Sequence, residues 1–220
     1  MAETARWREL QDLLEHVPLD DDAKDRLLAE MSRPGRHYHG VGHLATLWRR
    51  HRLYAAEAGL DEPEANALLA CAIAYHDSVY DVRRGDNEER SADAWLRESA
   101  NSPIDEADRR WVADTILATK DHFGYRADMP RDARAAGRER ARLWMLDLDL
   151  TPLGETREVF DENSRQLRQE FAHMDDDAWQ ESMKGFRRHV LDAPRIYRSQ
   201  PLAARFEAAA RDNFSRPIAG

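Results

Sequence analysis

The chain has 220 residues, of which 42% are hydrophobic and 34% charged, and it carries a formal net charge of −9. This acidic balance argues against a nucleic-acid polymer or an anionic membrane surface as the main partner, and no apolar run reaches the 18 residues that indicate a membrane span. A charged N-terminal stretch and a single cysteine, Cys71, predict a cytoplasmic protein with a reduced thiol in its core.

Helical periodicity dominates the chain. Apolar stripes with helical spacing run through residues 7–14, 44–53, 68–76, 111–117 and 143–150, and further helices are expected over 20–32, 88–99, 155–171, 176–189 and 202–213. The segment 121–140 has few large apolar side chains and indicates a loop followed by an exposed helix start. Strand-like alternation is almost absent. The pattern predicts an all-α bundle of nine or ten helices forming a single domain over 1–220.

The tryptophans occupy apolar helical positions and are expected in the core or at helix interfaces, not on a base-stacking platform; they are Trp7, Trp48, Trp95, Trp111, Trp144 and Trp179. The apolar helix expected over 202–213 could pack on its own domain or on a second copy of the chain, so a homodimer stays open.

The most apolar segment, "ALLACAIAY", ends directly in His76 and Asp77. His76 continues the stripe formed by Ala72 and Ile73, so its imidazole is expected to be buried. A buried polar group needs a partner. The simpler interpretation is that His76 is a core histidine with a local hydrogen-bond partner and that Asp77 is a local cap. A functional site would instead require other polar residues to converge on His76.

Two other stretches suggest convergence. His39 and His43 are four residues apart, a spacing that places two imidazoles on one helical face, although Gly40 leaves open whether the helix has begun there. Solvated loop histidines are the alternative. Asp149 faces inward in the leucine-rich helix over 143–150, whereas Asp147 turns away and is assigned a supporting or capping role. An inward carboxylate requires a cation, either an arginine or a metal ion.

A histidine, a His-Asp pair 33 residues later and a distant aspartate in a helical chain resemble the HD superfamily of metal-dependent phosphohydrolases. The words "RHYHGVGHL", "YHDSVYD" followed by "DNEERSA", "ILATKDH" and "DLDLTPLG" are similar to the motifs of one bacterial subfamily of predicted HD phosphohydrolases. The resemblance covers about 33–154. It implies an HD-domain-like bundle with its motif-bearing core in that range and C-terminal helices over 155–220 packed on the core.

The resemblance implies that His43, His76, Asp77 and Asp149 bind one divalent ion. Such a mixed nitrogen and oxygen site suits Mn²⁺, Fe²⁺, Co²⁺, Ni²⁺, Zn²⁺ or Mg²⁺. In binuclear members the aspartate of the pair bridges two metals, but Asn87 stands where a further histidine might be expected, which favours a single ion. The implied activity is hydrolysis of a small phosphomonoester or nucleotide-like substrate by a metal-activated water. The alternative is a non-catalytic ligand-binding or interaction protein that keeps a structural metal.

Further candidates surround these ligands. Asp77, Asp81 or Glu88 could act as general base or orient the attacking water, while the alternative for Glu88 is a helix N-terminal acid stabilised by the helix dipole. The residues expected to bind the substrate phosphate are His39, Lys120, His122 and Arg36, for which loop, surface or helix-terminal roles are the alternatives. The expected partner is therefore a small phosphorylated molecule.

Overall fold

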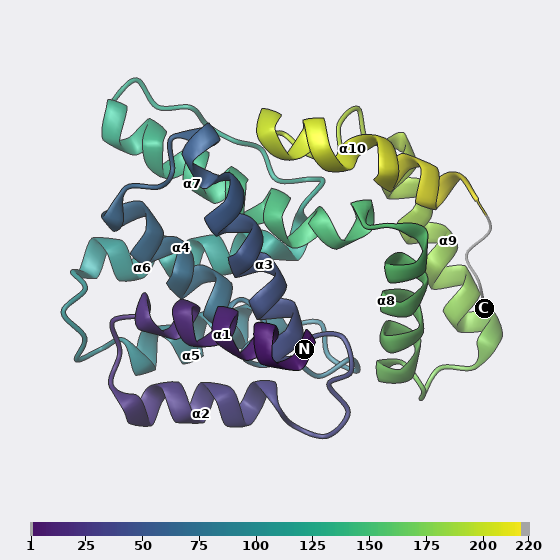
Figure 1. Cartoon of the computed structure of the whole chain (residues 1–220), viewed down its shortest axis with the longest axis horizontal. Coiled ribbons are helices and arrows are strands. Elements are labelled where there is room, and N and C mark those ends of the chain that lie inside the picture. Colours follow the sequence, from purple (N-terminus) through teal and green to yellow (C-terminus); the bar gives the residue numbers. More distant parts are fainter. Residues whose placement is uncertain (1, 217–220) are drawn as a thin grey trace.

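The computed structural model describes residues 2–216, and within that range it contains ten α-helices and no strand, which confirms the all-α prediction. The first seven helices are α1 (Ala2–Glu15), α2 (Asp21–Met31), α3 (Val41–Tyr54), α4 (Pro63–Tyr75), α5 (Asn87–Glu98), α6 (Glu106–Ala118) and α7 (Ala133–Leu150). The C-terminal helices are α8 (Arg157–Glu170), α9 (Asp176–Asp192) and α10 (Gln200–Ser215). Three 3₁₀ turns, η1 (Ala55–Ala58), η2 (Thr119–Asp121) and η3 (Thr151–Gly154), extend α3, α6 and α7. In Figure 1, α1 to α7 gather on the left and α8 to α10 lie mainly on the right.

Aspartates begin four of the helices and explain where they start. Asp20, Asp105, Asp132 and Asp175 each accept a hydrogen bond from the backbone N–H three residues further on, at the starts of α2, α6, α7 and α9. These caps satisfy donors that the first helical turn leaves without a partner. The loop over 122–132 and the helix that follows it agree with the loop and exposed helix start expected over 121–140.

The central helix is α4, which is buried from Leu68 to Tyr75 and is contacted by α3, α5, α6 and α7. A helix that is apolar on every side is stable only inside a core. Cys71 lies within this buried stretch as a free thiol. Because α4 is held on all sides, its last residues are fixed in place, and His76 directly follows them.

The tryptophans follow their prediction with one exception. Trp48, Trp95, Trp111 and Trp144 are buried, and Trp179 packs on Phe171 at the junction of α8 and α9, with ring centroids 5.6 Å apart. Trp7 is 48% exposed, so the prediction that it lies in the core or at a helix interface is wrong. It lies in the first half of α1, ahead of the core-facing residues Leu10 and Leu13.

The C-terminal helices attach to the end of α7. The Asp147 carboxylate accepts hydrogen bonds from the backbone N–H groups of Arg198 and Ser199 and from the Ser199 hydroxyl, so Asp147 has the capping role expected of it. Burial raises the pKa of Asp147 to about 6. The Tyr197 hydroxyl donates to the backbone oxygen of Leu150 over 2.9 Å. Helix α10 then packs on η3 and α9 of the same chain.

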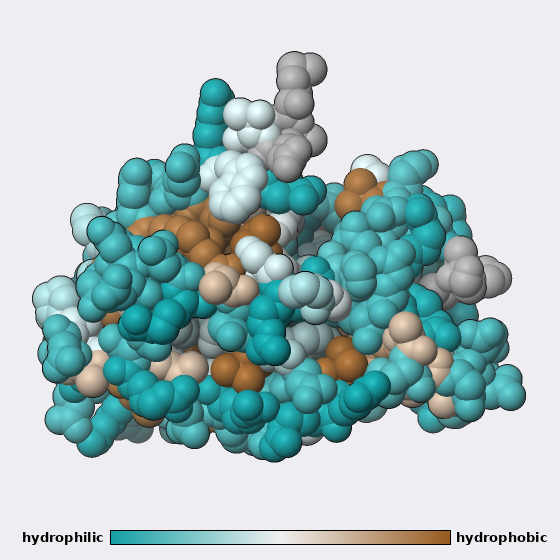
Figure 2. Space-filling view, turned by 90° about the horizontal axis from the view of Figure 1, so that it is seen from below, coloured by the Kyte–Doolittle hydropathy of each residue, from teal (hydrophilic) through white to brown (hydrophobic). Residues whose placement is uncertain are grey.

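The surface is consistent with the charged composition. The face seen in Figure 2 is mostly hydrophilic, with one larger hydrophobic area and a few smaller ones. Among the helices of residues 2–216, none is both long enough and apolar enough to cross a membrane.

Candidate metal centre

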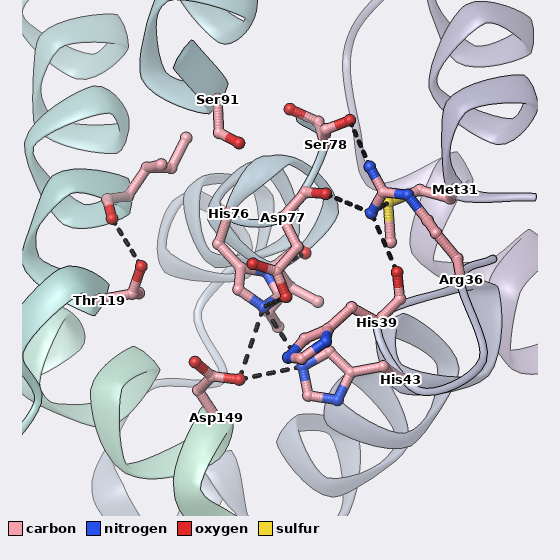
Figure 3. A network of polar contacts seen from close by, with 12 residues as sticks. Met31, Arg36, His39, His43, His76, Asp77, Ser78, Ser91, Thr119 and Asp149 are labelled. Atoms are coloured by element: carbon pink, nitrogen blue, oxygen red, sulfur yellow. Dashed lines mark hydrogen bonds and ion pairs between the residues drawn. The ribbon is translucent and has the colours of Figure 1, made fainter. Parts of the chain in front are cut away.

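Three helices that are far apart in sequence bring polar side chains to one point. His43 lies in the first turn of α3, His76 directly follows α4, and Asp149 is the last residue but one of α7. Figure 3 shows the three side chains pointing toward one another. Their ligand atoms all lie within 4.8 Å of one another, and they are named here the His-His-Asp cluster.

The distances within the cluster suit a metal ion. His43 Nε2 lies 2.9 Å from Asp149 Oδ1 and 3.3 Å from His76 Nε2, and the third side of the triangle, from His76 Nε2 to Asp149 Oδ1, is 3.5 Å. A point roughly 1.9 Å from all three atoms exists in such a triangle, close to the distance of about 2.0–2.2 Å between a first-row metal and nitrogen or oxygen ligands. The donor set therefore fits one divalent ion.

A backbone contact orients His76 for this role. Its Nδ1–H donates to the backbone oxygen of Ile73 over 2.9 Å, which places the proton on Nδ1. In the neutral ring the lone pair is then on Nε2, the atom that faces the cluster. A hydrogen bond of this kind to the outer ring nitrogen is the usual way in which a ligating histidine is fixed.

Asp77 and His122 adjoin the cluster. Asp77 Oδ2 lies 3.1 Å from His76 Nε2, and His122 Nε2 lies 2.8 Å from Asp149 Oδ2. Asp77 thus contacts one member of the cluster, His76. Its role as a fourth metal ligand stays a prediction. His122 was expected near substrate, and the structure places it against a carboxylate of the cluster.

Charge is concentrated and partly balanced in this site. Burial opposes ionisation of Asp149, but His76, His122 and His43 hold its pKa well below the usual range. Burial likewise opposes the charge on Asp77, whose pKa His76 lowers. Burial disfavours a proton on His76, yet the two carboxylates raise its pKa well above that of a free histidine. Burial lowers the pKa of His43. The carboxylates thus attract a cation to the place where His76 Nε2 lies.

Burial alone does not produce such a cluster, as another histidine shows. His51 is also buried, but it is paired with Asn66 at 2.7 Å and accepts the indole N–H of Trp144 at 3.1 Å. It is a satisfied core histidine of the kind considered as the alternative for His76. His76 instead faces two carboxylates and a second imidazole.

Arg36 ties the loop before α3 to the turn after α4. Its guanidinium donates to the backbone oxygens of His39, Asp77 and Ser78 at 2.9, 2.6 and 2.9 Å, as Figure 3 shows. Three donor contacts to backbone leave this side chain engaged in positioning the chain on both sides of the cluster. Substrate binding by Arg36 stays a prediction.

His39 is held by a residue that the sequence pattern does not indicate. Helix α3 begins only at Val41, so His39 precedes it in the loop and does not share a helical face with His43. Its Nδ1–H donates to Glu170 Oε2 over 2.6 Å, and the other Glu170 oxygen accepts the backbone N–H groups of Tyr38 and His39. Burial opposes a charge on His39, but Glu170 raises its pKa above the usual value. The His39 ring packs on Tyr80, with centroids 4.2 Å apart.

The remaining predicted residues lie around the turn between α4 and α5. The Asp81 carboxylate accepts the backbone N–H of Arg83, and the Asn87 amide bonds both to the N–H and to the oxygen of Asp81. Asn87 therefore fastens this turn. Lys120 pairs with Glu89, and Glu88 lies half-buried in the first turn of α5. Within residues 2–216 no hydrogen bond or ion pair joins Asp81, Glu88 or Lys120 to the cluster, and their expected roles stay predictions.

No protein-family model matches the chain, and no curated protein matches it significantly. The resemblance to the HD superfamily therefore stays a prediction from the sequence words.

Proposed function

We propose that this protein is a metal-dependent phosphohydrolase acting on a small phosphomonoester or nucleotide-like substrate. The observation that supports this proposal is the convergence of His43, His76 and Asp149 with all ligand atoms within 4.8 Å, bordered by Asp77. Three helices separated widely in sequence do not bring such a donor set together for packing alone, because burying it is costly without a cation. The reduced, buried thiol of Cys71 accords with the cytoplasmic location that forms part of the proposal.

The roles of the side chains follow from their contacts. A divalent ion, when bound, supplies a coordinated water of lowered pKa and offsets charge on the phosphoryl group. His43, His76 and Asp149 would hold that ion, and Asp77 would either complete the ligand set or accept a proton from the attacking water. His122 orients Asp149 through its hydrogen bond.

The charged form of His39 would offer the substrate a positive charge. The Glu170 carboxylate favours that form by raising the pKa of His39, and the ring centroid of His39 lies 5.9 Å from that of His43. A phosphate oxygen near the cluster could accept a hydrogen bond from its remaining N–H. Such a charge-assisted bond would offset the repulsion between the phosphate and the nearby carboxylates.

The proposal is tested by hydrolysis of nucleotides and small phosphomonoesters with Mn²⁺, Mg²⁺, Co²⁺ and Ni²⁺ added in turn. The His76→Ala and Asp77→Ala variants should each lose activity by at least about a hundredfold, more than residues that merely support metal ligands usually cost. His189→Ala provides the matched control, because His189 is an exposed histidine of α9 away from the cluster. Activity unaffected by both cluster variants would contradict the proposal. A bound metal with no hydrolysis across the screen would favour the non-catalytic alternative.

A further inference from the structure

A cavity of about 170 Å³ adjoins the cluster and has two kinds of wall. At the end beside the cluster lie the polar side chains of His39 and Asp149, and Tyr38, Asn163 and Ser164 also line the cavity. The remainder is largely apolar and comes from η3 and the C-terminal helices, with Leu153, Phe160, Leu167, Met183, Phe186 and Phe214. A cavity that is apolar over most of its surface and polar at one end is typical of a small-molecule site.

Aromatic rings form the inner part of the apolar wall. The Phe160 and Phe214 rings lie 5.3 Å apart between centroids and are buried, and Phe186 lies 5.7 Å from Phe214. Phe186 is 37% exposed, so the apolar lining reaches the protein surface at this residue. The rings come from α8, α9 and α10, so the C-terminal third supplies the wall while the helices before it supply the cluster.

The size of the cavity limits what it can hold. An apolar protein cavity of about 150 Å³ is large enough for benzene, so this cavity fits one aromatic ring or a short alkyl chain. A nucleoside is larger and also carries several hydroxyl groups that need partners. The side-chain amide of Asn163, a half-buried residue of the lining, forms no hydrogen bond within residues 2–216, so it is free to meet a single polar group.

We propose that the substrate of the cluster is a phosphomonoester whose organic part is a small apolar group, an aryl ring or a short alkyl chain, seated against Phe186 and Phe214. This inference rests on the proposed phosphohydrolase function and narrows it. Phosphate at the His39 and Asp149 end would place the ester oxygen at the boundary between the polar and apolar walls.

A second cavity beside the cluster would suit a more polar substrate. It measures about 420 Å³, is lined by the loop before α3 and by His43, and shares Tyr38, Pro152 and Asn163 with the apolar cavity. Its lining is rich in polar side chains, including Arg6, Glu155, Glu162 and Gln166. A polar organic group, such as a sugar, would be received there instead.

Binding of two non-hydrolysable phosphonates to the Mn²⁺-loaded protein separates these cases. Phenylphosphonate should bind at least about tenfold more tightly than 2-hydroxyethylphosphonate, because only the ring gains from burial against apolar carbon. Phe186→Ser should remove most of this preference. Val159→Ser is the matched control, since Val159 is 42% exposed, lies on α8 and lines the polar cavity. Met183→Thr repeats the test at a second lining residue.

The outcomes distinguish the inference from the function on which it rests. Equal binding of the two phosphonates, or a preference that both Phe186→Ser and Met183→Thr leave intact, would overturn the apolar pocket as the substrate site, even if simple phosphomonoesters are hydrolysed. A phenyl preference that depends on Phe186, combined with no hydrolysis of phenyl phosphate or of any other ester in the metal screen, would support the pocket and refute the hydrolase.

Discussion

At the scale of single residues, the least expected contact is between Glu170 and the loop that carries His39. The two residues are 131 positions apart, and the Glu170 carboxylate satisfies His39 Nδ1 and two backbone N–H groups at once. Burial opposes ionisation of Glu170, yet His39 lowers its pKa. Glu170 thereby favours the charged form of a histidine beside the cluster and holds its orientation.

Replacing Glu170 with glutamine should lower the pKa of His39, because the carboxylate that stabilises the imidazolium is lost while burial still disfavours the charge. The free energy of unfolding should fall by about 1–3 kcal/mol, the cost of losing a buried hydrogen bond to a charged partner. NMR titration of the histidines measures the first effect and urea unfolding the second. Glu158→Gln, an exposed position on the same helix, should leave the pKa of His39 unchanged. An unaltered His39 pKa in Glu170→Gln would show that the pair does not set the charge.

At the scale of elements, the junction between η3 and α10 determines how the C-terminal wall meets the cluster. At Gly154 a Cβ atom would lie 2.6 Å from the backbone oxygen of Phe206 and 2.7 Å from its Cβ. Only glycine allows an approach this close without displacing α10. Because α10 also carries Phe214, the packing at Gly154 influences the shape of the apolar cavity.

Two glycine substitutions should therefore act in opposite directions. Gly154→Ala should lower the free energy of unfolding by about 1–3 kcal/mol, because the added methyl overlaps the backbone of α10. Gly185→Ala lies within α9, where a Cβ would meet nothing within 4 Å, and should raise it by about 0.5–1 kcal/mol through helix propensity. Thermal or urea unfolding of both variants measures the difference. Equal stabilities for the two would show that η3 and α10 are not held in close contact.

At the scale of the whole molecule, the helices and the cluster could be predicted from the sequence, whereas the contacts made by the C-terminal third could not. The helices and the inward direction of Asp149 follow from periodicity, because packing demands that apolar residues repeat along one face. The spacing of His43, His76 and Asp149, read with the HD-like words, predicts the side chains that the structure brings together.

Other features of the site cannot be predicted from any short stretch of the sequence. Glu170 is one acid among many on a polar helix, and only the folded chain places it against His39. The apolar cavity is formed by residues from several elements, including half-buried ones whose spacing resembles that of any amphipathic helix. The exposure of Trp7 depends on where α1 leaves the core, which a short periodic stripe does not reveal.

The measurement that tests the central claim most directly is the metal content of the protein. After chelation and titration with Mn²⁺ or Zn²⁺, the wild-type chain should bind one ion, as measured by calorimetry and by native mass spectrometry. His43→Ala and Asp149→Asn should each weaken that binding by at least about a hundredfold, and His189→Ala should leave it unchanged. Absence of binding by the wild type, or equal binding by the cluster variants, would contradict a metal centre formed by His43, His76 and Asp149.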